Sequence, residues 1–295
     1  MNSMVRRSER VIRLSTTRGN IGRLLMARVL THGTLVVISA IFLFPLLWMV
    51  STSLKSTGEI FNPGLNLIPA HPTLENYRVA FSALPLLRNF FNSVFIATSF
   101  TVLSLFFCSL AGFAFAKLQF PGRNGLFLVL LGTMMVPGLV GLLPSFVIMS
   151  KLGWVDTYQA VIVPGVANAF GIFFMRQYIQ EVPDELLDAA RLDGCSNFTI
   201  YWRLVVPLIR PALTALSIMQ FMQSWNNFLW PLMVLRSNAM YTIVLAVASL
   251  PAANFNTPWG AIMAGTTVAV VPLVLFFLAF QKQFVAGVMR VGLKG

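Results

Sequence analysis

The sequence predicts an all-α integral membrane protein with six transmembrane helices. Of its 295 residues, 57% are hydrophobic and 10% are charged, whereas about a quarter of the residues of a soluble domain are charged. The charged residues also gather in clusters. The neutral runs between these clusters can hold helices of ~20 apolar residues, the length that crosses the hydrocarbon core of a bilayer. Composition and spacing therefore both favour a chain that crosses a membrane repeatedly.

Six runs without Asp, Glu, Lys or Arg give the expected spans. They extend between Arg28 and Lys55, Arg88 and Lys117, Arg123 and Lys151, Asp156 and Arg176, Arg210 and Arg236, and Arg236 and Lys282. The last run is too long for one span, and we expect it to hold a loop followed by a helix from about Trp259. Residues 29–283 then form the membrane domain, between a basic N-terminal tail (1–28) and a C-terminal tail (284–295).

The basic residues predict the orientation of the chain. With the N-terminus inside, 16 of the 21 lysines and arginines lie on inner segments, as the positive-inside rule requires. Both termini and residues 181–211 are therefore expected in the cytoplasm. The net charge of +12 is then a signal of topology rather than of nucleic-acid binding. The first apolar run is too long for a signal peptide and lacks a small-residue cleavage site, so we expect an uncleaved span.

Residues 181–211, between the fourth and fifth expected spans, hold five of the chain's nine acidic residues. Gly194 can adopt the left-handed conformation that ends a helix. Ser196 or Asn197 can cap a second helix, which we expect Pro207 to interrupt. The segment is therefore predicted to be a short helix, a glycine turn and another helix.

The first of these two helices has features that suit contact with another surface. Pro183 fits its first turn, and Arg191 lies near its negative end. Small alanines allow another backbone to approach, and Asp188 beside them can meet a cation. One face, at helical spacing, carries Leu186, Ala189, Ala190 and Asp193. The alternative is a solvated helix that touches nothing.

The same segment resembles the EAA loop of binding-protein-dependent ABC importer permeases, with the pattern E-A-A, three residues, G, nine residues, I-x-L-P. Here Asp188, Ala189 and Ala190 are followed after three residues by Gly194 and, nine residues later, by the stretch from Leu204 to Pro207. Asp replaces Glu, Leu replaces Ile and Val replaces Leu. Four further stretches are similar to the carbohydrate-importer branch, the relatives of the maltose permease's smaller subunit: Ser53–Phe61, Thr73–Phe81, Ser224–Leu232 and Gln281–Gly295.

This resemblance implies a type I ABC importer permease for a sugar or oligosaccharide in a bacterial inner membrane. A second homologous permease, a dimeric ATPase and an extracytoplasmic solute-binding protein are its implied partners. ATP and Mg would be bound by the ATPase and no cofactor by this chain. In the ATPase cleft Asp188 would meet a basic residue, the two alanines would permit close approach and Gly194 would set the turn, with Leu204 and Pro207 completing the loop. A permease for glycerol phosphate or a polyol stays open as an alternative, and a secondary carrier as a weaker one.

The fifth expected span carries the densest polar set. It consists of Gln220, Gln223, Ser224 and Asn227, within about a third of the helix circumference. Amides beside the rings of Trp225 and Trp230 suit sugar hydroxyls and the apolar face of a pyranose. These residues are our candidates for the substrate path. The alternative is that they hold helices together.

Two further contact segments follow from the resemblance. Asn254, Phe255 and Asn256 lie in the stretch from Ser249 to Trp259, which we expect to be an outer loop that contacts the binding protein. A plain connector is the alternative. The terminal residues Gly292, Lys294 and Gly295 match a tail that enters the ATPase dimer interface in maltose-type transporters, and a frayed end is the alternative.

The sequence carries no motif for covalent chemistry. It lacks a G-x-x-x-x-G-K-[ST] phosphate loop, H-E-x-x-H, G-x-S-x-G and a cluster of metal ligands. We therefore expect no catalytic residues and no metal site. The expected spans also hold no ionisable Asp, Glu, Lys or Arg, which disfavours a carrier driven by a coupling ion.

Overall fold

The computed structural model describes residues 2–62, 66–253 and 258–292, and the side chains of residues 26–62, 66–251 and 258–278. Within these ranges the chain forms helices and loops and no β-strand, which confirms the all-α prediction. By length and composition, three helices can cross a membrane alone, over Met26–Ser53, Leu86–Lys117 and Trp259–Leu278. The number rises to at most five if each of two strongly bent helix pairs is one span.

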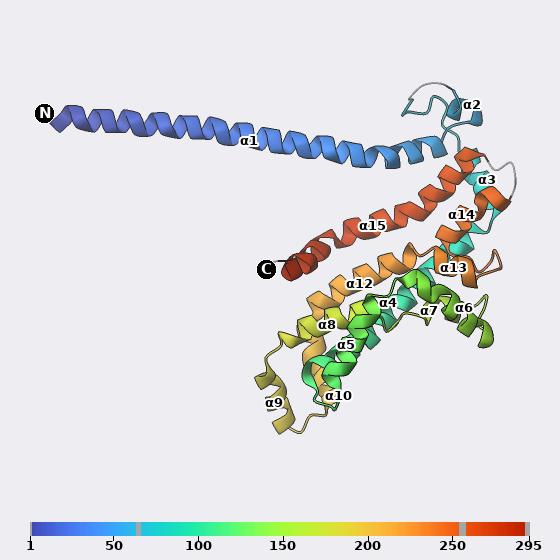
Figure 1. Ribbon diagram of the computed structural model, residues 1–295. Coiled ribbons are helices and arrows are strands. Elements are labelled where there is room, and N and C mark those ends of the chain that lie inside the picture. The colour runs from blue at the N-terminus through green and yellow to red at the C-terminus, as the bar shows by residue number, and fades with distance from the viewer. Residues whose placement is uncertain (1, 63–65, 254–257, 293–295) are drawn as a thin grey trace.

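The first helix, α1 (Asn2–Ser53), projects away from the rest of the molecule (Figure 1). Its 52 residues correspond to a length of about 78 Å at 1.5 Å per residue. The helix runs without a break through the expected boundary at residue 28, so the basic tail and the first span are one element. All side chains from Met26 to Leu47 are exposed, and most are apolar. They are suited to lipid or to another chain.

The centre of the molecule is α4 (Leu86–Lys117), which packs against α8 (Ala169–Gln180) and α12 (Arg210–Trp225) (Figure 1). The α4 and α8 backbones approach closely at Gly112. A Cβ atom there would lie 2.8 Å from the Cβ atom of Met175. Small residues at such crossings let membrane helices pack by van der Waals contact, so α4 and α8 form a tightly joined pair.

Pro137 and Pro164 lie at breaks in the third and fourth expected spans, whereas Pro144 lies inside α6 (Leu142–Lys151). The helix α5 (Arg123–Met134) is followed, beyond Pro137, by η1 (Gly138–Gly141) and α6, with a bend of 96°. In the fourth run, α7 (Tyr158–Ile162) is separated from α8 by a stretch with Pro164 and Gly165. The fifth run likewise divides into α12 and α13 (Leu229–Val234).

Two segments in which no span was expected contain helices. The first outer segment, residues 57–87, forms α2 (Thr57–Ile60) and α3 (Glu75–Ala83). The last neutral run holds α14 (Ile243–Ala253) before α15 (Trp259–Gly292). The start of α15 at Trp259 confirms the prediction, but the preceding stretch is not a loop bounded by two prolines. Its first residues belong to α14, with Pro251 inside the helix.

The segment after α8 forms α9 (Asp184–Leu192), α10 (Asn197–Ile200), the π-helix η2 (Tyr201–Val205) and α11 (Val206–Leu208). The predicted glycine turn is confirmed, since Gly194 has φ of +80°. Of the two predicted caps, Ser196 and Asn197, Ser196 caps the second helix. Its hydroxyl accepts a hydrogen bond of 3.2 Å from the N–H of Thr199.

The interruption predicted at Pro207 is found two residues later in the chain. Pro207 lies inside α11, and the chain bends by 82° after Leu208, where α12 begins. Proline cannot donate a backbone hydrogen bond to the preceding turn. The wider π-helical turn η2 directly precedes α11, and such turns accommodate a missing bond of this kind.

Candidate functional site

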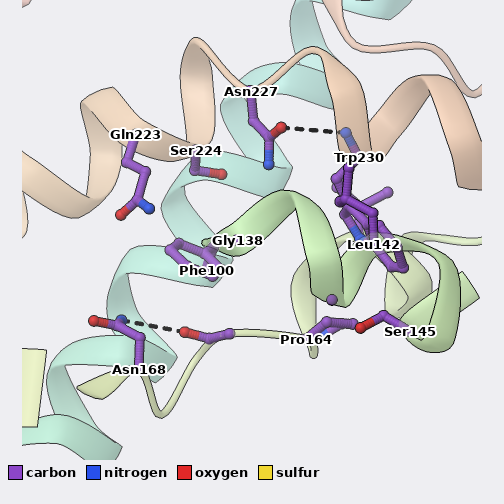
Figure 2. Close-up of a pocket in the computed structure, with 13 residues that line it drawn as sticks. Phe100, Gly138, Leu142, Ser145, Pro164, Asn168, Gln223, Ser224, Asn227 and Trp230 are labelled. Carbon is purple, nitrogen blue, oxygen red and sulfur yellow. Dashed lines mark hydrogen bonds between the residues drawn. The ribbon is translucent and has the colours of Figure 1, made fainter. Parts of the chain in front are cut away.

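A cavity of about 380 Å³ lies where α4, α6, α12 and α13 meet the break between α7 and α8 (Figure 2). Its lining combines aromatic and aliphatic side chains with amides and hydroxyls, and no lining residue is charged. The lining residues are Phe100, Gly138, Gly141, Leu142, Ser145, Val161, Pro164, Gly165, Asn168, Gln223, Ser224, Asn227 and Trp230.

Three helix breaks meet at this cavity. Gly138 follows the break after α5, Gly165 lies in the break before α8 with φ of +89°, and Asn227 lies between α12 and α13. Non-helical backbone at membrane depth is tolerated where it lines a cavity or is buried in protein. Discontinuous helices near the middle of the membrane are also where many transporters place their substrate site. The breaks therefore favour a binding function for the cavity.

Hydrogen bonds fix part of the polar lining (Figure 2). Asn168 caps α8, because its Oδ1 accepts a bond of 2.7 Å from the N–H of Gly171, and its Nδ2 donates to the carbonyl of Gly165 at 3.2 Å. Trp230 donates from Nε1 to the carbonyl of Ala160 at 2.8 Å, which holds its buried ring as a wall. The cavity thus presents a rigid rim.

Three of the four predicted polar residues line the cavity: Gln223, Ser224 and Asn227. Within the described part of the chain, Gln223 makes no side-chain hydrogen bond, and its exposed amide is free to bind a ligand. Gln220 does not line the cavity. It is 1% exposed and neither of its amide atoms has a hydrogen-bond partner. It lies in α12 one turn before Gln223, whereas Asn227 lies one turn after Gln223.

The neighbouring tryptophans take different roles. Trp230 belongs to the cavity, whereas Trp225 is buried and donates from Nε1 to the carbonyl of Ala269 in α15 at 3.3 Å. Sequence reasoning missed Phe100, Ser145 and Asn168, which come from three other segments. Asn168 could have been predicted from the sequence, because it is a polar residue in an apolar run and closely follows the helix-breaking residues Pro164 and Gly165.

The helix α9 has one buried and one exposed face. Leu187 is 1% exposed and belongs to the core, whereas Leu186 is 44% and Leu192 91% exposed. Of the predicted contact face, Leu186, Ala189 and Asp193 are exposed, and Ala190 is half-buried against the core. An apolar surface is therefore available for a partner beside the charged residues of α9.

The remaining residues of the motif are divided between core and surface. Asp188 accepts a hydrogen bond of 2.8 Å from Arg191 one turn later, so in this structure its cation comes from its own helix. Leu204 is half-buried and packs on the core, and Pro207 is exposed. Asn254, Phe255, Asn256, Lys294 and Gly295 lie outside the described residues, and Gly292 is the last residue of α15.

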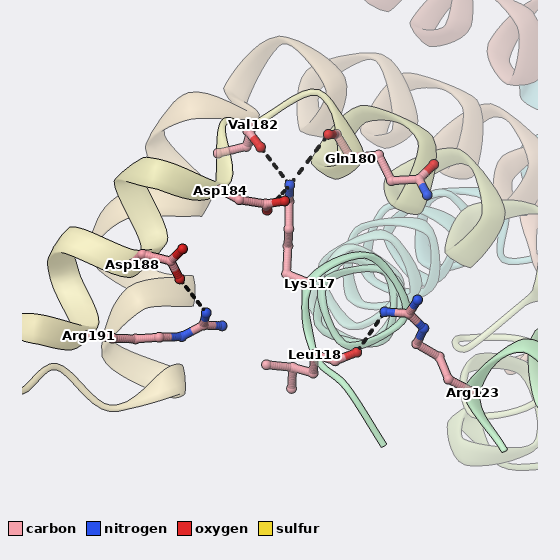
Figure 3. A network of polar contacts seen from close by, with 8 residues as sticks. All are labelled: Lys117, Leu118, Arg123, Gln180, Val182, Asp184, Asp188 and Arg191. Atoms are coloured by element: carbon pink, nitrogen blue, oxygen red, sulfur yellow. Dashed lines mark hydrogen bonds and ion pairs between the residues drawn. The ribbon is translucent and has the colours of Figure 1, made fainter. Parts of the chain in front are cut away.

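Lys117, the last residue of α4, holds the N-terminal end of α9 (Figure 3). In the sequence it served only as one of the basic residues that predict the orientation of the chain. Its Nζ donates to the carbonyl of Val182 at 2.6 Å, to Oδ1 of Asp184 at 2.7 Å and to the carbonyl of Gln180 at 3.4 Å. The hydrogen bond and charge of Lys117 hold the pKa of the Asp184 carboxyl below its usual value. We call these contacts the Lys117 clamp.

The opposite, N-terminal end of α4 holds the segment before α14. The Nδ2 of Asn89 donates to the carbonyls of Asn238 and Tyr241 at 2.7 and 3.0 Å. The Nδ2 of Asn92 donates to the carbonyls of Ala239 and Tyr241 at 2.9 and 3.0 Å. Both asparagines are buried, so this end of α4 is fixed by a neutral network.

The requirements of a metal site are not met by the described residues. They contain no group of three or more His, Cys, Asp or Glu residues placed to hold a metal ion. Cys108 and Cys195 are both free thiols.

The family described as "Binding-protein-dependent transport system inner membrane component" matches residues 106–290. The chain is 42% identical over 265 residues to the arabinooligosaccharides transport system permease protein AraQ of Halalkalibacterium halodurans, covering 88% of this chain and 93% of that protein. It is 37% identical over 247 residues to the lactose transport system permease protein LacG of Rhizobium radiobacter, covering 84% and 89%.

A solved structure has the same fold. The crystal structure of a bacterial ABC transporter involved in the import of the acidic polysaccharide alginate contains a chain that matches with a TM-score of 0.77, covering 87% of this chain and 95% of that chain at 22% identity. The all-α fold class and the resemblance predicted from the sequence are thereby confirmed, whereas the described residues provide three to five candidates for the six predicted spans. The chain belongs to the family of binding-protein-dependent transport system inner membrane components.

Proposed function

We propose that this chain is the transmembrane subunit of an ATP-driven importer for a neutral sugar or oligosaccharide. The observation that carries the proposal is the cavity, with its uncharged lining at three helix breaks. Amides and hydroxyls exchange hydrogen bonds with sugar hydroxyls, and the rings of Phe100 and Trp230 offer faces to the apolar side of a pyranose. The names of the arabinooligosaccharide and lactose relatives support this class of substrate.

A permease for glycerol phosphate or a polyol is the alternative. A phosphate group favours a cation, and Arg or Lys is the usual protein partner for it. None of the residues that line the cavity is cationic, which favours the neutral sugar. A partner permease would supply the rest of the path.

The coupling proposal concerns α9. We infer that its exposed face docks on a separate ATPase that binds ATP and Mg, with Asp188, Ala189 and Ala190 at the contact and Gly194 as the turn. Leu204 and Pro207 position the helix that follows. The exposed Leu186 and Leu192 support this role, because large exposed apolar side chains gain free energy when a partner covers them.

The remaining partners complete the proposal. The positive-inside rule supports a cytoplasmic position for both termini and for α9. A solute-binding protein would then dock on the opposite side, near residues 254–256. A second permease would cover part of the exposed apolar surface of α1, and the tail at Gly292, Lys294 and Gly295 would contact the ATPase.

Uptake by the assembled importer in proteoliposomes tests the cavity. Gln223→Ala removes a free amide from the lining, and the loss of one neutral hydrogen bond of about 0.5–1.5 kcal/mol predicts roughly 2- to 10-fold slower sugar uptake. Asn226→Ala is the matched control, because Asn226 is an exposed neighbour that bonds back to the carbonyl of Met222 and does not line the cavity.

The assay compares an arabinose oligosaccharide, lactose and sn-glycerol 3-phosphate as substrates. Uptake of a neutral sugar with a defect in Gln223→Ala supports the proposal. Equal uptake by both variants would exclude Gln223 from the path, and selective uptake of the phosphate would favour the alternative.

A further inference from the structure

The helix α9 has few connections to the rest of the described chain. Leu187 packs on the core, and the Asp188–Arg191 pair lies within α9 itself. Among the ion pairs of the described residues, Lys117–Asp184 is the one that joins α9 to another helix. The Lys117 clamp is therefore the main polar connection between α9 and the membrane helices.

The three acceptors of the clamp belong to three consecutive parts of the chain. Gln180 ends α8, Val182 lies in the three-residue linker, and Asp184 begins α9. An ammonium group has three N–H donors, and each meets one of these acceptors. The clamp thus fixes the linker at the point where α9 would otherwise pivot relative to α8.

The burial of the two partners indicates what the clamp does. The Lys117 side chain is 5% exposed, whereas that of Asp184 is 76% exposed. A salt bridge with one partner in water adds little to stability. A buried ammonium bonded to two backbone carbonyls, however, sets the direction in which α9 leaves α8. The geometry therefore favours a role in positioning over a role in stability.

The element that carries Lys117 reaches the cavity. Phe100 lines the cavity from the middle of α4, and α4 is packed closely against α8 at Gly112. A displacement of α9 that is not absorbed by the linker is passed to α4 and α8 together. It then reaches the cavity wall at Phe100 and Asn168.

We propose that Lys117 is a positioning residue that couples α9 to the cavity, by keeping the linker of residues 181–183 from acting as a free hinge. This inference rests on the proposed docking of α9 on an ATPase. With the clamp intact, movement of α9 moves α4 and α8. Without it, the ATPase still docks and hydrolyses ATP, but part of the movement is lost in the linker.

The test uses the assembled importer in proteoliposomes and measures ATP hydrolysed per sugar transported. Lys117→Met removes the ammonium and keeps an apolar stem. Changes along a coupled network alter coupling by roughly 2- to 30-fold, and we expect a rise of that size in the ratio, with ATPase copurification and stimulated hydrolysis retained. Lys117→Arg keeps the charge and donors and is expected to restore most of the coupling.

The matched control is Arg123→Met. Arg123 donates from Nη1 to the carbonyl of Leu118 at 3.0 Å, beside the same end of α4, and makes no contact with α9 among its hydrogen bonds. Its loss removes the same charge and is expected to leave the ratio unchanged. Asp184→Asn keeps the lysine and weakens the Lys117 clamp. If the importer does not assemble with Lys117→Met, the ratio measured with Asp184→Asn decides whether the clamp is needed for coupling.

The outcomes separate this inference from the proposed function. An unchanged ratio in Lys117→Met, or in Asp184→Asn where the first variant does not assemble, overturns the clamp while the docking of α9 stands. An equal rise in Arg123→Met also overturns it, because the effect would then belong to charge alone. If variants of the exposed α9 face leave ATPase binding intact, the proposed docking itself fails.

Discussion

The two ends of α4 are fastened in different ways. At the N-terminal end, Asn89 and Asn92 make four hydrogen bonds to the segment of residues 238–241, and both side chains are buried and neutral. At the C-terminal end, the single charge of Lys117 holds the linker before α9, and its partner Asp184 is 76% exposed.

This difference indicates different tasks. Buried side chains that are hydrogen-bonded to the backbone rigidify the structure around them. Here Asn89 and Asn92 share four such bonds, although the Oδ1 of Asn89 has no partner among the described residues. An ion pair with one exposed partner is open to water and is weakened by salt. We therefore infer that the N-terminal end of α4 is held rigidly in place. The C-terminal end is suited to move together with α9 when another protein displaces α9.

The largest effect is expected on the α9 side. If Asp188 forms a buried charge pair with the ATPase, Asp188→Ala should weaken binding by about 2–5 kcal/mol, the usual cost of removing one partner of such a pair. Copurification of the ATPase with the permease measures this loss. Glu185→Ala, which removes the same charge one turn earlier in α9, is the control, and equal behaviour of the two variants would contradict the assignment.

The next effect is a loss of stability at the other end of α4. Asn92→Leu leaves the carbonyl of Ala239 and the hydroxyl of Tyr158 without their bonds to Asn92. A fully buried group left unsatisfied costs about 1–3 kcal/mol. These two groups are partly buried, so the cost should lie toward the lower end, and the thermal unfolding temperature of the purified importer should fall. Lys117→Met should lower it less. The reverse order would contradict the proposed division between a rigid and a movable end.

The smallest effect is expected at the proposed contact with the binding protein. Phe255→Ala should reduce ATP hydrolysis stimulated by the loaded binding protein and leave basal hydrolysis unchanged, because an aromatic side chain on a polar segment gains free energy when a partner buries it. Hydrolysis with and without the binding protein measures the change. If stimulation stays normal, residues 254–256 are a connector.

Local signals in the sequence predicted local structure well. The neutral runs marked the helical segments, the left-handed turn at Gly194 followed from its lack of a side chain, and the cap at Ser196 from its hydroxyl. Each of these features depends on residues within a few positions of one another.

Features that depend on distant residues were not predicted. Lys117 and Asp184 are 67 positions apart, and the cavity is lined by residues from four of the neutral runs. Neither the Lys117–Asp184 contact nor the cavity could therefore be found from spacing along the chain. The helix α14 was missed because the last neutral run is too long for one span, and its part before Trp259 was taken as a loop. The interruption at Pro207 was misplaced by two residues, since Pro207 lies inside α11 and the chain bends after Leu208.

The central claim is that ATP, and not an ion gradient, drives uptake through this chain. The most direct measurement is the uptake of a labelled neutral oligosaccharide by proteoliposomes that contain the assembled importer and its binding protein. We predict that uptake requires ATP on the α9 side and continues when proton and sodium gradients are collapsed by ionophores. Uptake that continues without ATP and stops when those gradients are collapsed would contradict the account.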